Sequence, residues 1–195
     1  TADGGFDFSI DFNQQETLAT KLLFAQVSFA IAMQKKHGHF VLKIFDIFTK
    51  TTSDIIYLLS TLYKQVFIIK PNTSRLANSE KYIICKFFKG DKRGIINHII
   101  HEYPKLQIIN HISSILNFEL DYYYSNKIEE YNAIFGQQQI ENINSTLTLF
   151  SCKNKNDKIE TLKKNFIQKC IQWCEKYNIP YNKVLANHNI FLNVS

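Results

Sequence analysis

The chain has 195 residues, is 45% hydrophobic and carries a formal net charge of +6 at pH 7, with a pI near 9.0. This length and apolar content predict a packed core and exclude a largely disordered chain. The basic excess favours a polyanionic partner without establishing one, and the absence of a run of about 18 uninterrupted apolar residues predicts a soluble, intracellular protein with no membrane partner.

The first 36 residues predict a strand end, a loop and a long helix. Residues 1–16 are rich in Gly, Asp and Asn, as expected where a strand opens into a loop. Apolar residues then recur every three or four positions from 17 to 36, and His37-Gly38 supplies a stop. This predicted stripe consists of Leu18, Leu22, Ala25, Phe29, Ala32 and Met33.

The next 50 residues predict the late half of an α/β sheet. Residues 40–45 form a nearly continuous apolar run interrupted by Lys43, typical of a central strand. A helix is predicted over 53–63, a strand over 65–69 that ends before Pro71, and a last strand over 81–88 after the linker 72–78. Because no helix separates the last two strands, we expect them to form a hairpin-like pair.

After Gly90 the pattern becomes mostly helical, with apolar clusters at 95–100, 108–118 and 159–177. Residues 126–152 are ambiguous, since Ile140 and Ile143 have helical spacing while 146–150 suit a strand. We therefore predict one region over 1–90 and a mostly helical extension over 91–195. Neither the four scattered cysteines nor His98 and His101 have the pattern of a metal site, and none is predicted.

Three ionisable residues are expected at the active edge of this sheet: Asp3 at a strand exit, Lys43 inside an apolar strand and Glu80 entering the last strand. A lysine left unpaired in such a strand costs several kcal/mol, so it should reach the sheet edge or lie beside carboxylates. Each residue also has a purely structural explanation. Asp3 suits a turn, Lys43 a strand end that extends to solvent, and Glu80 a surface position.

Three segments carry a resemblance to a known family. They are ADGGF (2–6), GHFVLKIFDIFT (38–49) and KPNTSRLANSEKYIICK (70–86). In this order they resemble the Asp-, Lys- and Glu-bearing segments of FtsJ-like RNA ribose 2'-O-methyltransferases, above all the cap-specific ones. The resemblance implies the C-terminal half of a Rossmann-like S-adenosylmethionine-dependent methyltransferase sheet, followed by the helical extension.

The resemblance also implies a site. The family uses a Lys-Asp-Lys-Glu tetrad, which Asp3, Lys43 and Glu80 match, with Asp3 and Gly4 beside the cofactor S-adenosyl-L-methionine. The family's first Lys and its Gly-rich cofactor loop lie upstream of the matching segments. We therefore expect the upstream half of the domain, or a partner chain, to complete the cofactor pocket, and expect residues 1–195 alone to be incomplete for catalysis.

The expected activity is methylation of the first nucleotide's 2'-hydroxyl in capped mRNA, with Lys43 as base and hydroxyl anchor. The alternatives are a methyltransferase of ribosomal or other RNA, and an inactive RNA-binding or virion subunit of the same fold. The resemblance and a composition typical of low-G+C genomes favour a large cytoplasmic DNA virus, and hence the cytoplasm, a viral factory or the virion.

RNA contacts are expected from residues in loops at the same edge of the sheet. The candidates are Lys50, Ser74, Arg75 and Asn78, together with Lys70. Phe6, Phe8, Phe12 and Tyr82 could stack on bases, although aromatic residues of an α/β domain belong more often to the core.

Overall fold

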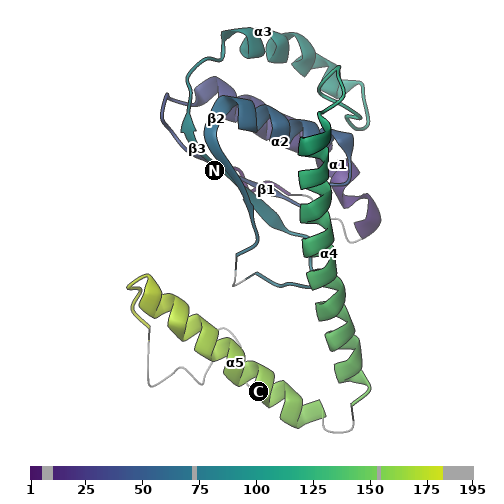
Figure 1. Cartoon of the computed structure of the whole chain (residues 1–195), viewed down its shortest axis with the longest axis vertical. Helices are drawn as coiled ribbons and strands as arrows, with labels where there is room; N and C mark the ends of the chain where they lie inside the picture. Colours follow the sequence, from purple (N-terminus) through teal and green to yellow (C-terminus); the bar gives the residue numbers. More distant parts are fainter. Residues whose placement is uncertain (6–10, 72–73, 153–154, 182–195) are drawn as a thin grey trace. The chain divides into compact units, whose positions relative to one another are not determined.

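The computed structural model describes residues 1–5, 11–71, 74–152 and 155–181 (Figure 1). Two compact units divide the chain, one from Thr1 to Gln139 and the other from Ile140 to Ser195. The predicted division at residue 90 stays a prediction. The structure adds that the first compact unit extends well beyond that residue, to Gln139.

The sheet has three strands in the order β1-β3-β2, where β1 is Phe40–Ile44, β2 is Tyr63–Ile69 and β3 is Lys81–Phe88. Both neighbours pair with β3 in the antiparallel sense, which confirms the hairpin-like last pair. Because β3 lies between them, β1 and β2 run parallel to each other without pairing. Among the described strands, the parallel pairing is an isolated bridge between Ala2 and Leu42.

Helix α1 (Gln15–Met33) follows the short 3-10 helix η1 (Phe12–Gln14) and packs on β1 and α2. Its buried apolar residues are Ala19, Leu23, Val27 and Ile31. The predicted stripe instead faces outward in part, since Phe29 and Met33 are 59% and 81% exposed. This correction has a simple cause: the helix is apolar on all sides, so spacing alone could not select the face that is buried.

The length and composition of α1 would also suit a membrane-spanning helix, with a mean hydropathy of 1.2 over its most apolar window. Core helices of soluble proteins share these properties. In this structure one face of α1 belongs to the core that the sheet and α2 complete.

Helix α2 (Lys50–Leu62) connects β1 to β2. It begins three residues earlier than predicted because the Thr49 hydroxyl accepts a hydrogen bond from the Thr52 amide, which caps its first turn. Its buried Ile55, Ile56 and Leu59 belong to the same core as Leu42 and Ile83 of the sheet. One face of β1 and β3 is thus covered, while Lys43 and Tyr82 point to the other face.

The remaining elements are helical, as predicted: α3 (Arg93–Glu102), the 3-10 helix η2 (Tyr103–Gln107), α4 (Tyr122–Phe150) and α5 (Lys155–Lys176). The ambiguous residues 146–150 continue α4. One local prediction was wrong: residues 108–118 are turns and bends instead of a helix.

The segment 108–118 is fastened to α1 and α2 by side chains. The Thr20 hydroxyl accepts from the Ile112 amide at 3.0 Å, and the Thr51 hydroxyl donates to the Ile112 carbonyl. The fully buried Asp54 accepts from the amides of Ile115 and Leu116 at 2.9 and 3.0 Å. Backbone groups that a helix would satisfy locally are therefore satisfied by distant side chains.

Candidate active site

Asp3 reaches Lys43 because the chain beside it runs along β1. The Ala2 amide donates to the Val41 carbonyl at 2.8 Å, and the Lys43 amide donates to the Ala2 carbonyl at 2.9 Å. Lys43 Nζ then lies 2.8 Å from Asp3 Oδ1 and 3.3 Å from the Asp3 carbonyl oxygen. The lysine side chain is 14% exposed and the aspartate side chain 72%, so the pair lies at the surface with its ammonium mostly covered.

Tyr82 lies directly opposite Lys43 in the β1–β3 register. The Lys43 amide points toward Ala2, so this is a non-hydrogen-bonded pair, in which side chains approach most closely. The Tyr82 hydroxyl donates to Glu80 Oε1 at 3.1 Å. Burial, the hydrogen bond to Glu80 and the charges of Glu80 and Asp3 raise the pKa of Tyr82, so the phenol stays a donor.

Glu80 and Asp3 thus lie on either side of the Lys43–Tyr82 pair, but they do not hold the ammonium in the same way. Of the described residues, Asp3 alone forms an ion pair with Lys43. The Glu80 carboxylate is held by Tyr82, the cross-strand neighbour of Lys43. The sequence pattern predicts only a stacking or core role for Tyr82.

Two lysines, the half-buried Lys70 and the buried Lys81, shape the loop that presents Glu80. Lys70 Nζ donates to the carbonyl and side-chain oxygens of Asn78 at 2.8 and 2.9 Å, and to the Glu80 carbonyl at 2.8 Å. Lys81 Nζ donates to the Ser79 carbonyl at 3.1 Å and pairs with Asp46 at 3.4 Å. Burial lowers the pKa of both lysines, against the opposing pull of nearby carboxylates. Both ammonium groups therefore serve to hold the backbone of this loop.

Glu16 holds the loop that follows the C-terminal end of β1, the end at which Lys43 lies. Its buried carboxylate accepts from the amides of Phe48 (3.0 and 3.1 Å) and Thr49 (2.9 Å), and from the Thr49 hydroxyl (2.8 Å). This residue was missed in the sequence because it lies 32 positions from its first partner. Its effect is to fix the turn that leads from β1 into α2.

The residues predicted to contact RNA differ in how they are used. Lys50 Nζ pairs with Asp54 at 3.0 Å and donates to the Phe118 carbonyl, and Asn78 binds Lys70. The Ser74 amide donates to the Pro71 carbonyl in a turn. Arg75 is exposed. Phe6, Phe8 and the side chain of Phe12 lie outside the described residues, so the predictions about them stay predictions.

Gly4 packs closely on α1. A Cβ at this position would lie 2.2 Å from Gln26 Nε2 and 3.2 Å from a methyl carbon of Leu22. At Gly5 a Cβ would be 3.7 Å from Lys43 Nζ, an ordinary contact distance. The main chain after Asp3 therefore passes tightly between α1 and the lysine.

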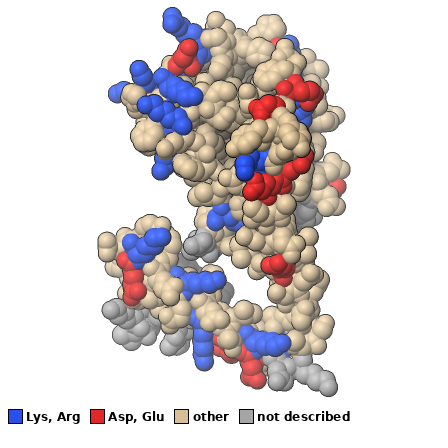
Figure 2. All heavy atoms as spheres, viewed as in Figure 1, with Lys and Arg blue, Asp and Glu red and all other residues tan. Residues whose placement is uncertain are grey.

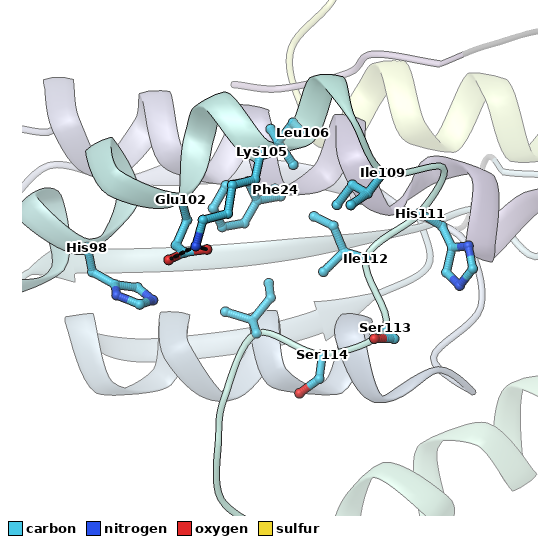
Figure 3. A pocket seen from close by; sticks show the side chains of 11 residues that line it. Phe24, His98, Glu102, Lys105, Leu106, Ile109, His111, Ile112, Ser113 and Ser114 are labelled. Carbon is cyan, nitrogen blue, oxygen red and sulfur yellow. Dashed lines mark hydrogen bonds and ion pairs between the residues drawn. The ribbon is translucent and has the colours of Figure 1, made fainter.

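A separate cavity of about 470 Å³ lies between α1, α3, η2 and the segment 109–115 (Figure 3). Glu102 and Lys105 point toward each other there, 2.7 Å apart, and hydrogen bonds from Lys105 and His101 lower the pKa of Glu102. None of Asp3, Lys43 and Glu80 lines this cavity. Within the described part of the chain, no three His, Cys, Asp or Glu side chains are grouped to hold a metal ion.

Comparison with known proteins supports the resemblance. Residues 1–88 match the family described as FtsJ-like methyltransferase. The chain is 40% identical over 100 residues to cap-specific mRNA (nucleoside-2'-O-)-methyltransferase 1 of Drosophila melanogaster, covering 50% of this chain and 13% of that protein. It is 30% identical over 165 residues to the protein of the same name from Trypanosoma brucei brucei, covering 82% of this chain and 45% of that protein.

The mouse protein of that name is 38% identical over 116 residues, which cover 60% of this chain and 14% of the relative. The chain thus spans less than half the length of each of these three relatives. The resemblance seen in the three motifs is confirmed for residues 1–88, which contain Asp3, Lys43 and Glu80. Residues 1–88 are thus similar to the FtsJ-like methyltransferase family, and the described strands among them form a small antiparallel sheet flanked by helices.

Proposed function

We propose that this chain forms part of an S-adenosylmethionine-dependent methyltransferase that acts on the 2'-hydroxyl of the first nucleotide of capped mRNA, in the cytoplasm. The observation that carries the proposal is the 2.8 Å pair between Lys43 and Asp3, next to Tyr82 and Glu80. All four residues lie within the segment that matches the methyltransferase family. The names of the relatives support capped mRNA as the substrate.

Lys43 is the residue that contacts the ribose 2'-hydroxyl. A lysine ammonium has three N–H donors, and Asp3 takes two of them through its carboxylate and carbonyl oxygens. The third can hold the ribose hydroxyl oxygen and stabilise the negative charge that develops as the hydroxyl reacts. The amine form would accept the hydroxyl proton, a role that requires the same position.

Tyr82 and Glu80 act as positioning residues. The bond between them places a carboxylate on the Lys43 face of β3. The half-buried Lys70 and the buried Lys81 fix the loop that carries Glu80. Two carboxylates therefore contribute to the electrostatic field at Lys43. Asp3 is in direct contact with the ammonium, and Glu80 is bonded to the hydroxyl of the neighbouring Tyr82. This arrangement orients the ammonium along the sheet edge.

The cofactor supplies an electrophilic methyl group on a sulfonium. Asp3 suits its amino group, because the carboxylate is 72% exposed while still paired with Lys43. Gly4 fits as a main-chain wall, since a side chain there would press on Gln26 and Leu22 of α1. A Rossmann-like arrangement is supported by the parallel direction of β1 and β2 on either side of α2, and by the parallel bridge at Ala2.

The test is a methyl-transfer assay on the full-length protein with radiolabelled cofactor and short RNAs that carry or lack a cap. Lys43→Ala is expected to abolish transfer, whereas Lys164→Ala, an exposed lysine of α5, should leave it unchanged. Thermal unfolding checks that both variants fold. Near-native transfer by folded Lys43→Ala would refute the proposed role, and equal transfer to capped and uncapped RNA would refute the proposed substrate.

A further inference from the structure

Three short segments carry a charge excess equal to the net positive charge of the chain. Residues 35–39, 61–65 and 86–93 contain seven Lys and Arg residues and one Asp, so seven positive charges less one negative leave +6. This equals the formal net charge of the entire chain, and the other residues sum to zero. Figure 2 shows Lys and Arg gathered on the side of the first unit where β3 ends.

The fold brings these three segments to one edge of the sheet. The His37 amide donates to the Phe88 carbonyl at 2.8 Å, and the Lys89 amide donates to the Leu62 carbonyl at 2.8 Å. We call the exposed lysines gathered here the basic edge; they are Lys35, Lys36, Lys64, Lys86 and Lys89. It lies where β1 begins and β3 ends, whereas Lys43 and Glu80 lie at the opposite ends of these strands.

An aromatic side chain is turned outward in the middle of the basic edge. β3 alternates buried and less buried residues until Phe87, which has a φ of 60°. This left-handed conformation is costly for an aromatic residue. It breaks the alternation, so that Phe88 enters the core against Tyr63 while Phe87 is 41% exposed.

His39 keeps this ring in place. Its Nδ1 accepts a hydrogen bond from the Phe87 amide at 3.2 Å, and the two rings meet edge to face with centroids 5.0 Å apart. A second exposed ring lies nearby on β2, where Phe67 is 45% exposed with Lys86 Nζ 5.7 Å from its centroid. The exposed lysines around these rings form no ion pair with any residue that the structure describes. Exposed rings among such cations are the combination that binds single-stranded nucleic acid, through base stacking and phosphate contacts.

We propose that the basic edge is a second RNA-binding surface, which holds a single-stranded segment of RNA with a base stacked on Phe87. Tyr82 and Phe87 are five positions apart on β3, a distance of about 17 Å at the rise of a strand. A stacked strand covers this distance in about five nucleotides. The same RNA molecule can therefore contact both Lys43 and the basic edge, so the inference extends the proposed function to RNA beyond the reacting nucleotide.

The experiment measures binding of a labelled, uncapped single-stranded RNA of about 15 nucleotides to the full-length protein by fluorescence anisotropy. Lys36→Glu with Lys64→Glu reverses two charges of the basic edge. Lys164→Glu with Lys169→Glu makes the same change on exposed residues of α5 and is the matched control. The slope of log affinity against log salt is negative, and the first pair should reduce its magnitude by about 1.4, whereas the control pair should not.

Phe87→Asn separates stacking from folding. Asparagine tolerates the left-handed conformation, so the variant should fold at least as well as the native chain. Affinity for the RNA should fall by about tenfold. Unchanged affinity in this variant, or equal losses in the two lysine pairs, would overturn the proposal, as would equally tight binding of duplex RNA or of anionic vesicles.

This binding assay needs neither cofactor nor cap. A failed methyl-transfer experiment would therefore leave its result intact, and loss of the basic edge can be recognised while Lys43 chemistry persists.

Discussion

Replacing Asp54 with alanine should destabilise the first unit by about 3–5 kcal/mol, the cost of breaking a buried ion pair. The Asp54 side chain is fully buried and accepts from Lys50 Nζ, Ser114 Oγ and the amides of Ile115 and Leu116, all between 2.9 and 3.0 Å. Hydrogen bonds to a charged group contribute about 1.5–3 kcal/mol each. The sum is reduced because Lys50 is 35% exposed and can be hydrated again.

The assay is urea unfolding of the native chain, Asp54→Ala and Glu129→Ala, the last being an exposed carboxylate of α4. Hydrogen exchange gives the local readout, since the amides of Ile115 and Leu116 should exchange faster in Asp54→Ala alone. A free energy of unfolding within about 1 kcal/mol of the native value, well below the loss expected for a broken buried pair, would refute the reasoning. Unchanged exchange at both amides would refute it as well.

Three further predictions follow from the same contacts. Tyr82→Phe removes the donor to Glu80 and should lower kcat about tenfold or more with little change in KM, because the phenyl ring keeps its packing; a change confined to KM would contradict a positioning role. Glu16→Gln leaves one oxygen in place of two for the amides of the loop after β1, and should lower the unfolding free energy by about 1–3 kcal/mol in urea titrations, whereas an unchanged midpoint would show that the loop holds without it. Burial raises the pKa of Cys85 from 9.0 to about 12, so the unfolded thiol ionises first; stability is complete below pH 9 and falls as pH rises toward 12, and Cys85→Ala should flatten that slope in alkaline unfolding curves.

Local pattern predicted the strands well because their sequences are short and apolar. The last strand was expected over 81–88 and occupies those residues, and β1 ends one residue before its predicted end. The order of strands in the sheet was not predictable in this way. It depends on β3 entering between two strands that precede it, which no local spacing records.

The candidate site, too, was predictable where local motifs define it and not where contacts between distant segments define it. Asp3, Lys43 and Glu80 could be selected from motifs, whereas the contact between Tyr82 and Glu80 follows from register across β1 and β3. Lys50 looked like a phosphate contact because it lies in a loop region. Its partner Asp54 is buried one helical turn later, and burial of that kind is decided by the segment 108–118 packing from far along the chain.

The central position of β3 in the sheet also determines the order in which the strands can pair during synthesis. Lys43 and its cross-strand neighbour Tyr82 are 39 positions apart, so a growing polypeptide has synthesised β1, α2 and β2 before the strand that separates them exists. Until residues 81–88 emerge from the ribosome, β1 and β2 have no shared partner and Glu80 has no phenol to hold it. The contacts of Tyr82 with Lys43 and Glu80 therefore cannot form before residues 81–88 are available.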